Sequence, residues 1–196
     1  MSSEPPGVFK GRQFAPEIIV LCVRRYLRYA LSLRNLEEIM AERNVHVDHV
    51  TIWRWIQCYA PELNRRCRCE LRMTNGSWRV DETYLRVAGR WTYFIYGGGF
   101  YPSAIDELKR TRELGRRCRC RPVRYLNNVV EQDHRAIKRR VRAMQGFRAF
   151  HSAWRTIQGI EIVNMIRKGQ IRWLPKDDIF GQAAFIAGLF GVALAT

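Results

Sequence analysis

Apolar residues recur every three or four positions along residues 16–60, which is the spacing of helices that bury one face. Pro16 suits the first position of a helix formed by EIIVLCVRRYLRYAL. This helix is expected to be amphipathic and basic. Its inward set is Ile18, Leu21 and Cys22 with the leucines, and its outward set is Arg24, Arg25 and Arg28.

Two further helices are predicted, each opened by a polar cap. Ser32 can cap LRNLEEIMAER, and Asp48 can cap HVTIWRWIQCYA, which Pro61 is expected to end. The inward residues are Leu36, Ile39 and Met40 in the first helix and Ile52, Trp55, Ile56 and Tyr59 in the second. Because a short turn joins them, the pair has the outline of a helix-turn-helix.

The outer face of the third helix carries candidate DNA contacts. Recognition helices read bases mainly with their first turns, which here contain His49, Thr51 and Arg54. Arg54 is suited to a bidentate contact with guanine. The alternative is a plain three-helix packing unit with a solvated outer face.

Alternation of apolar and polar residues replaces the helical spacing after residue 77. WRVDETYLRV and RWTYFIY flank Ala88 and Gly89, which predicts an antiparallel hairpin. Asp81 lies within the first strand, where an unpaired charge costs several kcal/mol, so such a carboxylate usually has a metal, a cation or a function. The alternative is an edge-strand pair of Asp81 and Glu82 bonded to arginines.

A later helix, opening at Asn127 or Asn128, places Glu131 in its first turn. His134, Arg135 and Lys138 follow on the same face, so this face can combine a metal-binding carboxylate with phosphate-binding cations. An ordinary ion pair between Glu131 and Arg135 is the alternative. Beyond it, a long helix with Trp154, Ile157, Ile160, Ile162, Val163 and Ile166 is expected to pack in the core.

Composition points to a polyanionic partner. The 196 residues are 47% hydrophobic, and 34 Lys and Arg against 18 Asp and Glu give a net charge of +16, which suits nucleic acid or an acidic membrane surface. The basic stretch that includes Arg135, Lys138 and Arg139 suits backbone phosphates. The apolar run 179–196 falls short of the roughly 20 residues of a membrane span, so a packing helix or tail is expected and no membrane partner.

The N-terminus lacks the apolar core of a signal peptide, so a cytoplasmic location with reduced cysteines is expected. Cysteines occur in two RRCRC repeats, at residues 65–69 and 116–120. One residue between paired cysteines is too few for the usual zinc spacing. We therefore predict neither structural disulfides nor a zinc site.

Several segments together resemble bacterial insertion-sequence transposases, most closely the insertion-sequence six family. They are WRVDETYLRV, YPSAIDELK, VRYLNNVVEQDHRAIKR and IEIVNMIRKGQ, preceded by a head that is similar to that family's DNA-binding head. The likeness runs from about Phe9 to Gln170 with one interruption. It implies an Asp-Asp-Glu triad on a ribonuclease-H-like, integrase-like domain that binds two Mg²⁺ or Mn²⁺ ions.

By this resemblance Asp81 is the first acid and Glu131 the last, and both are metal ligands. Counting back from Tyr101 places Tyr96 where relatives have the middle Asp, and no Asp or Glu occurs from Thr83 to Ser103. Relatives have about fifty more residues here. Gly97, Gly98 and Gly99 therefore mark the expected seam of an internal deletion, and activity is expected to be lost.

The predicted fold is α+β: a helix-turn-helix head followed by an incomplete ribonuclease-H-like α/β domain. The expected boundaries are 1–64 for the head, 65–77 for a basic linker, 78–175 for the truncated domain and 176–196 for the apolar tail. The resemblance implies DNA transposition, by metal-dependent strand cleavage and transfer at the terminal inverted repeats of an insertion sequence. This copy is expected to be an internally deleted, catalytically defective derivative that retains DNA binding and is associated with the nucleoid. The alternative is a non-catalytic DNA-binding protein that occupies element ends or mixes with intact transposase. The expected protein partners are copies of the same chain, in a homo-oligomer, or intact transposase, in a mixed oligomer.

Overall fold

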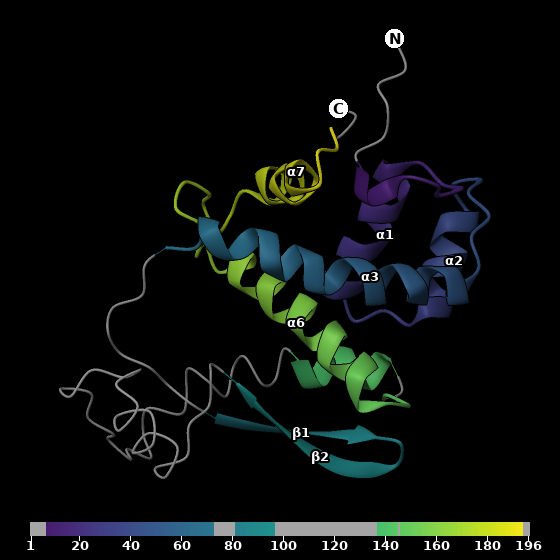
Figure 1. Cartoon of the computed structure of the whole chain (residues 1–196), viewed down its shortest axis with the longest axis vertical. Coiled ribbons are helices and arrows are strands. Elements are labelled where there is room, and N and C mark those ends of the chain that lie inside the picture. Colours follow the sequence, from purple (N-terminus) through teal and green to yellow (C-terminus); the bar gives the residue numbers. More distant parts are fainter. Residues whose placement is uncertain (1–6, 73–80, 97–136, 145, 194–196) are drawn as a thin grey trace, which may run out of the picture.

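The computed structural model describes residues 7–72, 81–96, 137–144 and 146–193. Five named helices lie in these ranges, α1 (Pro16–Arg28), α2 (Leu33–Ala41), α3 (His49–Cys67), α6 (Phe150–Arg167) and α7 (Ile179–Leu189). The strands are β1 (Asp81–Val87) and β2 (Arg90–Tyr96), and short 3₁₀ turns cover Gly7–Phe9 (η1) and Arg68–Glu70 (η2). The five helices pack into what we call the helical body, and the hairpin lies to one side of it (Figure 1).

The helix starts expected from the sequence are confirmed. Pro16 occupies the start of α1, and Ser32 caps α2 in a reciprocal capping box with Asn35. Asp48 caps α3 by accepting the backbone N–H groups of Val50 at 2.7 Å and Thr51 at 3.2 Å. These side chains satisfy N–H groups that have no partner inside the helix.

The predicted end of α3 is wrong, because the helix continues through Pro61 to Cys67. A proline inside a helix costs about 3 kcal/mol through its missing N–H and its clash with the preceding turn. Burial offsets this cost here, since Leu63 and Cys67 are fully buried. The first residues of the basic linker expected at 65–77 are therefore helical, as the end of α3 and the η2 turn.

The arginines of α1 also depart from the expected outward positions. Arg28 donates from Nη1 to Oε1 of Gln182 in α7 at 2.9 Å, and its own carbonyl accepts two bonds from Arg140. The Nε atom of Arg24 is buried and has no hydrogen-bond partner among the described residues, and burial lowers the pKa of this guanidinium. The basic side of α1 is thus partly covered because α7 and residues 137–143 pack beside it.

Helix α6 lies against both α3 and α1 (Figure 1). Its Ile157, Ile160, Ile162, Val163 and Ile166 are buried as expected, whereas Trp154 is exposed. Gly159 permits the crossing, because a Cβ atom there would lie 2.7 Å from Ala60 Cβ and 2.8 Å from Leu27 Cδ1. Glycine is required at this position by the close approach of three helices.

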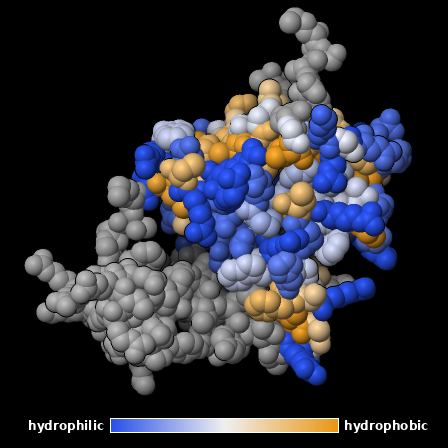
Figure 2. Space-filling model, in the orientation of Figure 1, coloured by the Kyte–Doolittle hydropathy of each residue, from blue (hydrophilic) through white to orange (hydrophobic). Residues whose placement is uncertain are grey.

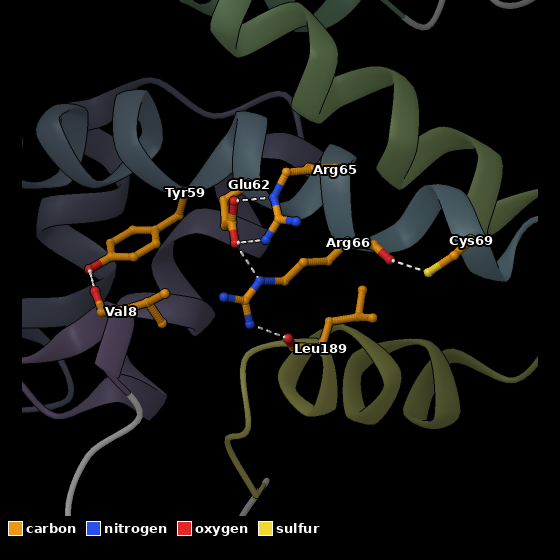
Figure 3. A network of polar contacts seen from close by, with 7 residues as sticks. All are labelled: Val8, Tyr59, Glu62, Arg65, Arg66, Cys69 and Leu189. Carbon is orange, nitrogen blue, oxygen red and sulfur yellow. Dashed lines mark hydrogen bonds and ion pairs between the residues drawn. The ribbon is translucent and has the colours of Figure 1, made fainter.

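Helix α7 folds back onto the start of the chain, so the structure has the packing helix, one of the two forms left open for the apolar C-terminal run. Phe190 is 1% exposed, and its ring lies 6.0 Å from those of Phe9 and Tyr59. Arg66 of α3 donates to the carbonyl of Leu189 at 2.7 Å (Figure 3). Among the described residues, no helix is long and apolar enough to cross a membrane.

The hairpin is confirmed with the predicted turn. Strands β1 and β2 pair antiparallel, from Val87 opposite Arg90 to Asp81 opposite Tyr96. Ala88 and Gly89 turn the chain with φ values of 50° and 77°, which the twist of a two-residue hairpin requires. Contact with the helical body comes from the turn end, where Val87 is buried and the Ala88 N–H donates to the Phe147 carbonyl at 2.7 Å.

Candidate nucleic-acid interface

Helices α2 and α3 are joined by a tight turn. The chain leaves α2 through Asn44, whose φ of 58° lies in the left-handed region, and the Val45 N–H donates back to the Met40 carbonyl at 3.0 Å. Val47 is buried and Asp48 then opens α3. The first turn of α3 is therefore held in a defined position against α2.

Two of the three predicted DNA contacts on α3 already have partners within the protein. His49 Nδ1 lies 3.1 Å from Glu37 Oε2 of α2, and the Thr51 hydroxyl donates to Asp48 Oδ2 at 2.8 Å. The Val50 N–H and the Thr51 hydroxyl hold the pKa of Asp48 below its usual value. These contacts tie the start of α3 to Asp48 and to Glu37 of α2 while leaving His49 partly exposed.

Arg54 is exposed, and no hydrogen bond or ion pair is assigned to it among the described residues. Val50 and Trp53, which the sequence reading missed, are 41% and 43% exposed beside it. The periodicity contained a signal for them, since Ile52, Trp55 and Ile56 leave no inward position for Val50 or Trp53. Arg54 can therefore offer five N–H donors on the same exposed turns as these two apolar side chains.

The basic residues of the short helix 137–143 differ in exposure. Lys138 and Arg139 are exposed on the short helix of residues 137–143, as a phosphate contact requires, whereas Arg140 turns inward to the Arg28 carbonyl. Arg135 lies outside the described residues. Hydrophilic residues cover most of the face of the helical body seen in Figure 2.

The candidate acids are described only in part. Asp81 begins β1, and its backbone pairs with Tyr96, the residue at the expected place of the middle acid. Glu131 lies outside the described residues. Within the described ranges, no three His, Cys, Asp or Glu side chains gather as a metal site would need. Cys22, Cys58, Cys67 and Cys69 are free there, and burial raises the pKa of Cys67 to about 12.

Comparison with protein families matches residues 96–170 to a DDE domain. The chain is 30% identical to the transposase for insertion sequence-like element IS431mec of Staphylococcus aureus strains Mu50 and N315. It is equally similar to the transposase for insertion sequence element IS257 in transposon Tn4003 of Staphylococcus aureus. Each match takes in 85% of this chain and 91% of the relative. No solved structure matches the chain.

The alignment with the IS431mec transposase has more positions than this chain has residues in it. It runs over 208 positions but takes in 85% of 196 residues, about 167, so about 41 positions of the relative face gaps in this chain. The family match also begins at Tyr96, after the first candidate acid and next to the glycines. A DDE domain has a ribonuclease-H-like fold, of which the described residues contain one two-stranded sheet and helices.

Proposed function

The chain belongs to the insertion-sequence transposases with a DDE domain, and from that premise we propose that it is an internally deleted copy that binds element ends without joining strands. Transposases of this class bind DNA and use divalent metal ions. The gaps of about 41 positions in the chain, out of 208 aligned, carry the proposal. We infer that they correspond to the missing segment before Phe100, with its middle acid.

The donor set is too small for a productive pair of metal ions. Asp81 and Glu131 are the carboxylates that would hold Mg²⁺ or Mn²⁺, which would activate the attacking oxygen and stabilise the leaving one when bound. Two hard cations close together need several oxygen ligands, and the stretch from Thr83 to Ser103 offers no third acid. Strand cleavage and transfer should therefore fall to background.

DNA binding by the head is the part of the function that should remain. His49, Thr51 and Arg54 lie at the start of α3, and the capping of α3 and its packing on α2 do not depend on the missing segment. Arg135, Lys138 and Arg139 would add contacts to backbone phosphates. The partner is then duplex DNA carrying the terminal inverted repeats, which implies location at the nucleoid of a bacterium.

The domain boundaries at 64, 77 and 175 stay predictions, as does assembly into homo-oligomers or mixed oligomers with intact transposase. Helices α6 and α7, from the two later regions, pack on helices of the proposed head. Experiments on DNA binding should consequently use the full chain, because a fragment ending near residue 64 would expose the side chains that α6 covers.

The chemistry is tested with Mg²⁺-dependent cleavage and strand transfer on duplexes carrying the element's inverted repeats. The full chain should give background product only. A version restored with the corresponding segment of the IS257 transposase should regain turnover, and Asp81→Asn in the restored chain should abolish it again. Robust strand transfer by the short chain would contradict the proposal.

A second candidate function is that of a non-catalytic regulator that occupies element ends. The capped and exposed start of α3 favours it, since a reading surface persists while an acid is missing. Gel shifts of repeat DNA by the full chain should weaken as salt rises, and Arg54→Ala should abolish the preference for the repeat. Equal binding of any duplex would argue against this role.

A further inference from the structure

Two apolar side chains on α3 point to the kind of base that the head reads. The geometry assigns Val50 and Trp53 as contacts to thymine methyl groups, beside a guanine contact made by Arg54. This inference rests on the proposed DNA binding and extends it from a general interface to a sequence class. The recognised site should contain thymine and guanine close together.

The first turns of α3 separate two kinds of residue. His49 and Thr51 are bonded to Glu37 and Asp48, so part of their hydrogen-bonding capacity is used inside the protein. Val50, Trp53 and Arg54 instead project from the body on the first two turns of the helix. The residues most free to contact a ligand are therefore two apolar groups and one guanidinium.

The two tryptophans of α3 differ in how far they are buried. Trp55 is 3% exposed, whereas Trp53 is 43% exposed although only one residue separates them. Trp55 packs edge-on to Phe14, with ring centroids 5.2 Å apart, and so belongs to the core. Trp53 keeps 43% of its surface exposed after folding, and a partner could bury this remaining aromatic surface.

The major groove offers one apolar group to such side chains, the C5-methyl of thymine. Guanine offers two acceptors that match the fork of an arginine, and Arg54 is the arginine on this face. A helix rises about 1.5 Å per residue, so Val50 and Arg54 are separated by about 6 Å along the axis. This corresponds to about two base pairs at 3.4 Å each.

The experiment begins with selection of sites from a randomised duplex library by the full chain. The selected sites should contain thymine within about two or three base pairs of a guanine. Each thymine is then replaced by uracil, which removes the methyl group and no hydrogen-bonding atom. The loss of about one methyl contact, near 0.8 kcal/mol, should lower affinity about four-fold at one or two positions.

Variants identify the side chains. In Trp53→Ala or Val50→Ala the uracil effect should shrink below two-fold at the thymine each contacts. Trp173→Ala is the matched control, because Trp173 is 62% exposed but follows Arg172, whose N–H bonds to Glu70 beyond the C-terminal end of α3, at the opposite end from Val50 and Trp53. The uracil scan on the unmodified chain needs no variant, so it stands even where a substitution harms folding.

Each outcome bears on a defined part of the argument. Selected sites without thymine, tolerance of uracil at every position, or the same uracil profile in Trp53→Ala, Val50→Ala and Trp173→Ala would overturn the thymine assignment. The proposal of sequence-specific DNA binding would still hold in those cases, because the library selection would still give a consensus site. Recovery of sequences with no preference would remove both the assignment and the proposed sequence-specific binding.

Discussion

The helical body and the β-hairpin differ in how they are held. The body closes on itself: α6 packs on α1 and α3, and α7 returns to η1 through Phe190. The hairpin is held mainly by its own ladder and by the Val87 and Phe147 contacts at its turn. A two-stranded hairpin alone is marginal in water. The body therefore supplies most of the stability of the described residues.

This difference places the two proposed functional regions, one for DNA recognition and one for chemistry, in different parts of the chain. The proposed DNA-reading surface is the exposed start of α3, which is one of the helices of the body. Asp81 lies in the hairpin, at the end far from its turn. A loss of residues after β2 can then remove chemistry without removing the framework of DNA recognition. The comparison can be tested by substitutions that act on one region and leave the other unchanged.

The largest effect is expected at the helix crossing in the body. Gly159→Ala places a Cβ atom 2.7 Å from Ala60 Cβ, which forces α6 away from α3. Overpacking of this kind costs about 2–3 kcal/mol. The free energy of unfolding measured with urea should fall by that amount.

Gly188→Ala is the matched control in α7, where a Cβ atom would meet nothing within 4 Å. It should leave stability unchanged or raise it by up to about 1 kcal/mol, because alanine favours helix. Equal losses at both glycines would mean that the crossing is not a point of close packing.

A smaller effect is expected from the ion pairs near the end of α3. Glu62 accepts from Arg65 at 2.7 Å and from Arg66 at 2.6 Å (Figure 3), and these bonds lower its pKa from 4.5 to about 2. A depressed pKa means that the folded state favours the carboxylate. Its contribution is present above the ordinary pKa and is lost as pH falls from 4.5 to about 2.

Glu62→Gln should lower the free energy of unfolding by about 1 kcal/mol near neutral pH, and the difference should vanish near the lower end of that window. Urea titrations at a series of pH values measure it. Glu38→Gln, at an exposed position on α2, serves as the control and should change little. A constant difference at every pH would show that the charge of Glu62 is not the cause.

The smallest global effect is expected in the hairpin. Gly89 has a φ of 77° and open space around its Cα, so Gly89→Ala costs about 1 kcal/mol of backbone strain. This cost should appear as about five-fold faster amide exchange in β1 and β2. The urea midpoint of the body should stay within experimental scatter.

Gly169→Ala makes the comparison sharper, because Gly169 has a φ of 71° within the body and a Cβ atom there would lie 3.2 Å from Lys176. Gly169→Ala should lower the free energy of unfolding of the body by at least about 1 kcal/mol, which is what Gly89→Ala costs locally in the hairpin. This loss should appear as a lower urea midpoint. If Gly89→Ala moves the global midpoint equally, the hairpin and the body unfold as one unit and the distinction fails.

Local signals in the sequence predicted what local forces determine. Ser32 and Asp48 cap helices through bonds to residues three positions away or fewer, and Ala88 with Gly89 turns the chain through its own dihedral angles. Each outcome depends on a few neighbouring residues. The predicted helix starts and the predicted hairpin turn were therefore correct.

The errors arose where distant segments meet. The continuation of α3 past Pro61 depends on burial of Leu63 and Cys67 in a body completed by α6 and α7, about one hundred residues later. The partly buried position of Arg28 depends on Gln182 in α7. Val50 and Trp53 were not predicted as candidate contacts. Their exposure follows only once all the buried positions of α3 are known.

Phe190 has a consequence for the history of the gene. Its ring fills the space between Phe9 and Tyr59, so the core of the first helices is completed by residues translated after the proposed seam. A frameshift at the seam would have replaced α6 and α7 with unrelated sequence and left that core open. The proposed deletion would therefore have removed a whole number of codons, and comparison of the genomic DNA with an intact element tests this.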